Sequence, residues 1–188
     1  MRADRSLFGR GAVVAAALAL VAPLAGAERA AAAPQPGVSG SYLAARAAAA
    51  REDHAAAARY FAEALARDPG HHALRDRALT FMLLTGDLRG AAAVAGVLAQ
   101  ADPDHRLATL ALVAEDFHGA EFDSAIARLD AEPNGVNRLV AGLLRGWAEV
   151  GRADAEAMEA AFAALAGDAM TEVFRDYHLG LARAAMGD

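Results

Sequence analysis

The sequence predicts an all-α fold made of stacked helical hairpins. When the chain is shifted along itself by 34 residues, Asp53, Asp87 and Glu121 fall on the same repeat position. The same shift aligns three further sets, namely Ala57, Ala91 and Ala125, then Phe61, Ala95 and Leu129, and the pairs Asp68-Pro69 and Asp102-Pro103. A fixed repeat length in this range is typical of helix–turn–helix units that stack on one another. No stretch shows the β-branched alternation of a strand.

Residues 1–27 have the features of an export signal. Three arginines precede an apolar run over residues 11–24, and the small residues Ala25-Gly26-Ala27 form a cleavage motif. An uncleaved anchor is the alternative, but the run is shorter than the roughly 20 residues that span a bilayer, and Pro23 interrupts it. We therefore expect cleavage before Glu28, export to a periplasm, and no stable membrane insertion afterwards.

The amino-acid composition excludes several kinds of binding partner and of catalytic chemistry. Cleavage would remove three arginines and one aspartate, which takes the net charge from −6 to −8. An acidic surface repels phosphate backbones, so nucleic acid is not expected as a partner. The chain has no Cys, which excludes disulfides and thiolate metal sites. Every basic residue is Arg, which excludes Schiff-base and P-loop lysines.

The remaining chain divides into a linker and a helical repeat domain. Residues 28–40 are rich in Ala, Pro and Gly without a helical period, which predicts a flexible linker before a repeat domain over residues 41–188. Four hairpins are expected, over about 42–66, 73–100, 107–129 and 136–166, with turns near 51–53, 85–87, 119 and 151–152. Pro69 and Pro103 lack the amide that would continue a helix and so end a hairpin.

The start of each second helix carries a carboxylate at the same repeat position. Asp53, Asp87 and Glu121 can accept hydrogen bonds from the free backbone amides there and meet the positive end of the helix dipole. Glu is the weaker cap of the two residue types. We therefore expect the third hairpin to be capped less well than the first two.

The final segment, residues 170–186, has the pattern of one further first helix. Its apolar stripe has no second helix of its own to cover it, and consists of Val173, Phe174, Tyr177 and Leu181. One interpretation is a C-terminal capping helix, which repeat arrays need for solubility. The other, which we favour, is that a longer solenoid is truncated at Asp188, because exposed apolar stripes usually mark a missing contact.

These repeated residues resemble the tetratricopeptide repeat, a helix–turn–helix unit with small residues at fixed points and a proline near its end. The matching residues are Ala45, Ala57, Phe61, Ala64 and Pro69 in the first unit, Met82, Ala91, Leu98 and Pro103 in the second, and Glu121 and Ala125 in the third. The match covers about residues 38–131. Ala48 and Ala95 depart from it, since they stand where the family usually places large rings. The resemblance implies a right-handed α-solenoid.

The same resemblance implies a concave groove lined by the first helix of each hairpin, which takes an extended peptide or a partner's helix. The family's groove positions fall on Tyr42, Arg46, Asp76, Thr80, Leu83, Leu110, Ala114 and Phe117. This mixture of charged, hydroxyl and apolar groups suits a protein ligand. Ordinary hairpin core is an equal alternative for Leu83, Leu110 and Phe117 on the helical period alone. Trp147 is either an interface anchor or core packing.

Catalytic and metal-binding patterns are weak in this sequence. His71, His72 and His105 lack a His-Glu-x-x-His spacing, and His71 and His105 fit loops between hairpins. A second polar cluster surrounds Gly119 but lacks the alternating oxygen ligands of a calcium loop, and consists of Asp116, His118, Glu121 and Asp123. The serines after residue 27, which are Ser39, Ser41 and Ser124, lie outside any Gly-x-Ser-x-Gly motif. We expect no catalytic residues, cofactor or metal.

The sequence therefore predicts a non-catalytic periplasmic scaffold that binds another protein, in envelope assembly or secretion. Two other hypotheses stay open at this point. The chain is the N-terminal fragment of a longer solenoid whose functional part lies beyond Asp188, or it is a metal-binding enzyme with its site near His118. The partner's identity, the oligomeric state and the pathway do not follow from the sequence.

Overall fold

The computed structural model describes residues 37–131, 134–165, 167 and 169–187. The expected export signal and residues 28–36 of the expected linker lie outside these residues. The chain divides into two units, Met1–Gln35 and Pro36–Asp188, and all of the structure reported below belongs to the second. Regular structure in the described residues is entirely helical, which confirms the all-α prediction.

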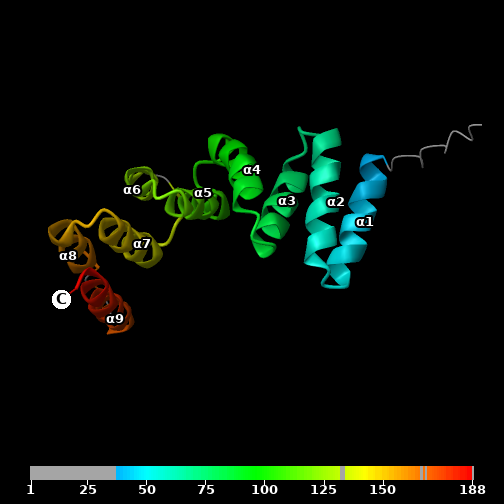
Figure 1. Cartoon of the computed structure of the whole chain (residues 1–188). Helices are drawn as coiled ribbons and strands as arrows, with labels where there is room; N and C mark the ends of the chain where they lie inside the picture. The colour runs from blue at the N-terminus through cyan, green and yellow to red at the C-terminus, as the bar shows by residue number, and fades with distance from the viewer. Residues whose placement is uncertain (1–36, 132–133, 166, 168, 188) are drawn as a thin grey trace, which may run out of the picture. The chain divides into compact units, whose positions relative to one another are not determined.

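The described helices follow one another with short turns, in the order that the repeat predicts (Figure 1). They are α1 (Val38–Ala50), α2 (His54–Arg67), α3 (His72–Leu84), α4 (Leu88–Ala101), α5 (Arg106–His118), α6 (Phe122–Asp130), α7 (Arg138–Gly151), α8 (Ala155–Ala163) and α9 (Ala169–Met186). Helix α1 begins at Val38, three residues before the expected start at Ser41. The reason is that Val38 packs against the first core cluster and Gly37 supplies the extended backbone before it.

The turn inside each hairpin has the same backbone geometry. Its middle residue has a positive φ, which is 58° at Glu52, 75° at Gly86, 57° at Ala120 and 58° at Ala153. The amide of the next residue bonds the carbonyl five positions back, as from Asp53 to Ala48 at 3.0 Å and from the equivalent residues of the other turns. This is the Schellman termination, in which a left-handed residue ends the first helix. The turns recur every 34 residues and then after 33.

Three of the four second helices are capped by an aspartate. Asp53 accepts from the Ala56 amide at 3.0 Å, and Asp87 accepts from the Gly90 amide at 2.9 Å. Asp154 does the same for α8, with the Ala157 amide at 2.9 Å. Glu121 makes no side-chain cap bond at α6, in line with the weaker cap expected there.

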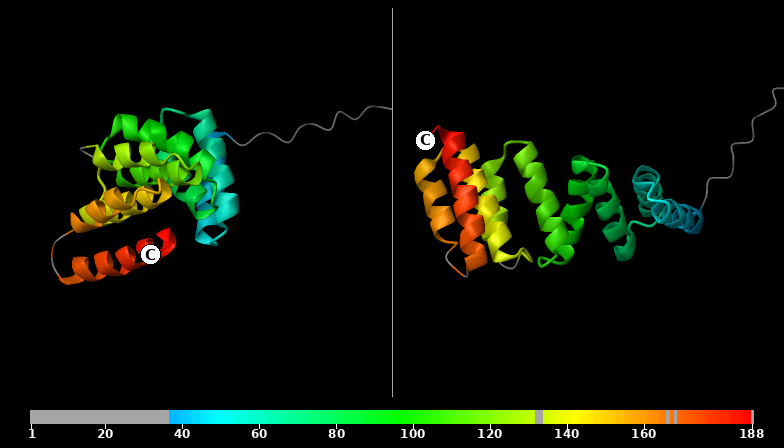
Figure 2. Two further views of the ribbon diagram at one scale, coloured as in Figure 1. Left: turned by 60° about the vertical axis from the view of Figure 1, so that its left-hand side comes forward. Right: turned by 90° about the horizontal axis from the view of Figure 1, so that it is seen from below.

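Each helix packs against the next one in sequence, and α9 packs against both α7 and α8 (Figure 2). The core is divided accordingly into clusters that join the two helices of one hairpin to the first helix of the next. In the first cluster Phe61 of α2 is surrounded by Ala45 of α1 and Leu74 of α3. Later clusters join α3, α4 and α5, then α5, α6 and α7, and finally α7, α8 and α9. Small residues at these contacts allow close approach of the helix axes.

Candidate protein-binding site

Tyr42 and Arg46 lie one helical turn apart on α1, and both side chains are exposed. The Arg46 guanidinium lies over the Tyr42 ring, 5.9 Å from its centroid. The same ring meets Phe61 of α2 edge-on at 6.2 Å, and Phe61 stacks on Phe81 of α3 at 5.2 Å. An exposed ring held by the core on one edge and by an arginine on its face is largely ordered before binding. Such ordering lowers the entropy cost of recognition.

A cavity of about 380 Å³ adjoins Tyr42, between the first turns of α1 and α3. It is lined by Val38, Ser39, Tyr42, His71, Ala73, Leu74 and Arg77. Ser39, His71 and Arg77 were not among the predicted groove residues. Arg77 could have been included, because it lies three residues before Thr80 and therefore on a neighbouring part of the same helix face. The cavity adds a hydroxyl, an imidazole and a second guanidinium to the Tyr42–Arg46 pair.

The predicted polar positions of α3 already have partners within the chain. Asp76 is bonded to His105 of the third hairpin, with 2.9 Å between Oδ1 and Nε2. The Nδ1 of His105 accepts from the Ala108 amide at 3.1 Å, so Nε2 carries the proton and donates to Asp76. Thr80 donates its hydroxyl to the Asp76 carbonyl at 2.8 Å. Asp76 therefore joins two hairpins, which reduces its availability to a ligand.

The predicted apolar positions are neither fully buried nor fully exposed. Leu83 packs against the cluster of α3, α4 and α5, and Phe117 packs against the next cluster and meets Phe122 edge-on at 5.6 Å. Leu110 and Ala114 of α5 are also partly accessible. Leu83 and Phe117 therefore contribute to the core while part of each side chain stays accessible.

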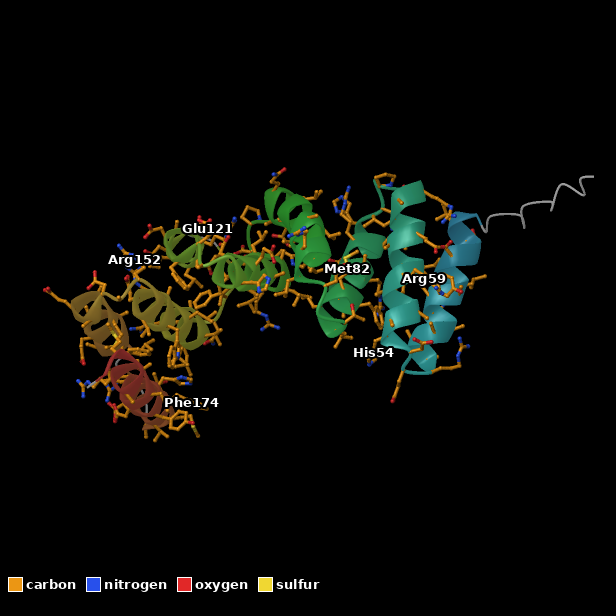
Figure 3. The ribbon with its side chains drawn as sticks, viewed as in Figure 1. His54, Arg59, Met82, Glu121, Arg152 and Phe174 are labelled. Atoms are coloured by element: carbon orange, nitrogen blue, oxygen red, sulfur yellow. The ribbon has the colours of Figure 1, made fainter. Side chains whose placement is uncertain are left out.

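Arginines pair with two of the three carboxylates in the polar cluster around Gly119. Asp116 accepts from Arg128 at 2.6 Å, and Asp123 pairs with Arg152 at 3.0 Å. Arg152 also donates to Glu149 at 2.7 Å, and this hydrogen bond is the main reason why the pKa of Arg152 is raised. Figure 3 labels Arg152 and Glu121 in this region. Within the described ranges, no group of three or more His, Cys, Asp or Glu residues is arranged to hold a metal ion.

Two further cavities lack the exposed ring found at Tyr42. A cavity of about 440 Å³ between α7 and α8 is lined by Arg138, Arg145 and Glu149, each of which is bonded to another part of the chain. A smaller one of about 240 Å³ lies beside Glu115, whose buried Oε2 has no hydrogen-bond partner among the described residues. Neither presents an exposed aromatic anchor, so the Tyr42 region is the best candidate for recognition.

None of the described helices is long and apolar enough to cross a membrane. In comparisons with models of protein families, with curated proteins and with solved structures, the chain matches none of them. The resemblance to the tetratricopeptide repeat therefore stays a prediction that rests on the residues quoted above.

Proposed function

We propose that the chain is a non-catalytic, exported scaffold whose hairpins form a right-handed, tetratricopeptide-like solenoid and hold another protein against their first helices. The observation that carries this proposal is the exposed Tyr42–Arg46 pair beside its cavity, because it joins an ordered aromatic ring to positive charge. Buried aromatic and arginine anchors supply much of the binding energy at protein interfaces. The repeat and the predicted signal peptide support the rest of the proposal.

The chemistry of the region also suggests what the partner presents. Arg46 and Arg77 are exposed, whereas Asp76, which precedes Arg77 in the sequence, is already bonded to His105. A partner segment that places a carboxylate beside an apolar side chain would satisfy both the guanidinium groups and the Tyr42 ring. We therefore expect an extended peptide or a helix with an acidic residue at its centre.

A matched pair of variants tests the binding surface. Arg59 lies over the Tyr60 ring at 4.7 Å on α2, so it reproduces the Arg46–Tyr42 arrangement on a second helix (Figure 3 labels Arg59). The purified protein would be used to capture partners from an envelope extract, with quantification by mass spectrometry. Arg46→Glu is expected to reduce capture of a specific partner at least about tenfold, and Arg59→Glu is expected to leave it unchanged. Equal capture by wild type and Arg46→Glu would remove this surface from the proposal.

Export is tested separately. The full-length chain expressed in a bacterial host is expected to be recovered from the periplasm with Glu28 as its first residue. Amino-terminal sequencing of the recovered protein makes this measurement. Recovery of the full-length chain from the cytoplasm would contradict export while leaving the binding surface unaffected.

A further inference from the structure

Helix α9 has an apolar face that nothing covers among the described residues. The helices α3, α5 and α7 each contribute to two consecutive core clusters, one with the preceding hairpin and one with their own second helix. Helix α9 contributes to one cluster only, through Leu179, Ala182 and Met186. The other side of α9 therefore corresponds to the side on which the earlier first helices pack against another helix.

The composition of that side is apolar or small throughout. Large side chains stay exposed there, by 64% at Met170, 65% at Val173 and 62% at Tyr177, and by 43% at both Phe174 and Leu181. We call these residues, together with Gly180 and Ala184, the α9 stripe (Phe174 is labelled in Figure 3). They recur at spacings of three and four, which places them on one face of a helix. An exposed apolar face of this length is typical of an interaction surface.

Four of the five large residues of the stripe lie in the first half of the helix, whereas its small residues, Gly180 and Ala184, lie in the second half beside Leu181. A Cβ added at Gly180 would meet nothing within 4 Å. Glycines within α7 are different, because the space at Gly146 is filled by the Phe162 ring of α8 and the space at Gly142 by Leu165. In this protein a helical glycine can thus receive a large side chain from a neighbouring helix, and the place at Gly180 is open.

Most charges beside the stripe have a partner within the chain. Asp176 is bonded to Arg175 at 2.8 Å, and Glu172 adds to the negative charge around the same arginine. Arg183 is held by two bonds from its guanidinium to Glu159 of α8, of 2.5 and 2.7 Å. These groups leave one excess negative charge per copy beside the stripe, so the repulsion between two copies at this face is small.

We propose that the α9 stripe binds the α9 stripe of a second copy of this chain, with the two helices antiparallel about a two-fold axis at Tyr177. Residues equally far from Tyr177 on either side then face each other across the axis. Phe174 lies over Gly180 of the second copy, Met170 lies over Ala184, and Val173 meets Leu181. Large residues thereby meet small ones at two of these pairs, and two branched apolar residues meet at the third. The stripe therefore matches itself across the axis, as a two-fold interface requires.

The size of the stripe sets the expected strength. An 18-residue helix is about 27 Å long, so the contact lies at the low end of the range of specific interfaces. We expect a dimer that forms in the micromolar range or more weakly, and that is detected by its dependence on concentration. This dimer does not depend on partner binding at the Tyr42 cavity, so one proposal can be wrong while the other is right.

Gly180→Leu provides the decisive test. The space at Gly180 is open in the monomer and leucine favours helix, so the variant should fold while filling the place that Phe174 of the second copy would take. Gly96→Leu is the matched control, because Gly96 of α4 also has open space around it. Sedimentation velocity from low micromolar to near-millimolar concentration should show dimers for wild type and Gly96→Leu and monomers for Gly180→Leu. A monomeric wild type, or an undisturbed Gly180→Leu dimer, overturns the proposal.

A charge exchange tests the antiparallel register. Val173→Glu should abolish the dimer by placing a carboxylate against Leu181 of the second copy. The double variant Val173→Glu with Leu181→Arg should restore it, because each new carboxylate then faces a guanidinium of the second copy. Circular dichroism confirms that the variants keep their helices. Failure of the double variant to dimerise, with its helices intact, contradicts the antiparallel register.

Discussion

At the scale of single residues, three of the four hairpin turns place a residue other than glycine in a left-handed backbone conformation, which costs stability. Glu52, Ala120 and Ala153 occupy left-handed backbone conformations, while the second hairpin uses Gly86 at the same point. A residue with a Cβ loses on the order of 1 kcal/mol in this conformation. The repeat tolerates the cost because the turn also supplies the hydrogen bonds that end the first helix and start the second.

Exchanging these residue types should change stability in opposite directions. Ala120→Gly is expected to raise the free energy of unfolding by up to about 1 kcal/mol, and Gly86→Ala is expected to lower it by about 1 kcal/mol or more. A Cβ at Gly86 would meet nothing within 4 Å, so its effect isolates the backbone strain. Urea unfolding followed by circular dichroism measures both. A loss of stability in Ala120→Gly would contradict this account of the turns.

The ion pair between Glu159 and Arg183 should stabilise the folded state at neutral pH and lose this effect at acidic pH. The hydrogen bonds from Arg183 lower the pKa of Glu159 below its ordinary value of 4.5. A carboxyl whose pKa is lower in the folded state stabilises that state above its unfolded pKa and loses this contribution as the pH falls through the folded value. The melting temperature of wild type should therefore exceed that of Glu159→Gln at pH 7, and the difference should shrink below about pH 4.5. In an Arg183→Gln background the same comparison should show no such shrinkage.

At the scale of the helices, the N-terminal caps could be predicted from the sequence where the repeat length is constant. Asp53 and Asp87 cap as expected because both turns follow the 34-residue spacing. Asp154 was missed because the last turn comes after 33 residues, so the constant spacing points to Ala155 instead. The absent cap bond at Glu121 follows the known ranking of capping residues.

Replacing the weak cap should therefore stabilise the third hairpin. Glu121→Asp is expected to raise the free energy of unfolding by roughly 0.5–1 kcal/mol, because the shorter side chain can reach the free amides of the first turn of α6. Asp87→Ala serves as the opposite control and should lower it by about 1 kcal/mol. Thermal unfolding of the three proteins in one buffer gives the comparison. An unchanged free energy of unfolding in Glu121→Asp would mean that the missing cap bond does not limit the stability of α6.

Helix contacts at glycine should be sensitive to a single methyl group. A Cβ at Gly146 of α7 would come within 2.5 Å of the Phe162 ring, so Gly146→Ala is expected to cost about 1–3 kcal/mol through overpacking. At Gly96, where nothing lies within 4 Å, the same substitution should stabilise α4 by roughly 0.5–1 kcal/mol. Denaturant unfolding distinguishes the two. Equal effects would mean that the ring in the first case moves aside freely.

At the scale of the whole molecule, the sequence predicts the order of helices better than it predicts the binding site. Periodic residues are local, so the repeat length predicts where the first three hairpins turn, whereas the fourth turn comes one residue early. The resemblance implies groove positions for Tyr42 and Arg46, and both side chains are exposed. The bond between Asp76 and His105 joins residues 29 apart, and the cavity beside Tyr42 is lined by residues of both α1 and α3. Such contacts depend on how the hairpins pack, and the repeat pattern does not predict which individual residues then meet.

Because each helix packs mainly against its neighbours in sequence, local stability should differ from helix to helix along the chain. Helices α3 and α5 each bury four residues between two neighbours, whereas α9 buries Ala182 alone. In dilute protein, amide hydrogen exchange should be at least about tenfold faster in α9 than in α3 and α5. Raising the concentration should slow exchange in α9 if the proposed dimer forms. Uniform protection of all helices in dilute solution would indicate one cooperative unit instead.

Three glycines of α7 each accommodate a large side chain. These contacts also constrain which substitutions can accumulate during evolution. Gly142 lies under Leu165, Gly146 under Phe162, and Gly151 under Phe122. A larger residue at one member of such a pair is tolerated only when its counterpart becomes smaller. Relatives of this protein should therefore show correlated substitution at these pairs, and an alanine at position 146 should accompany a residue smaller than phenylalanine at position 162.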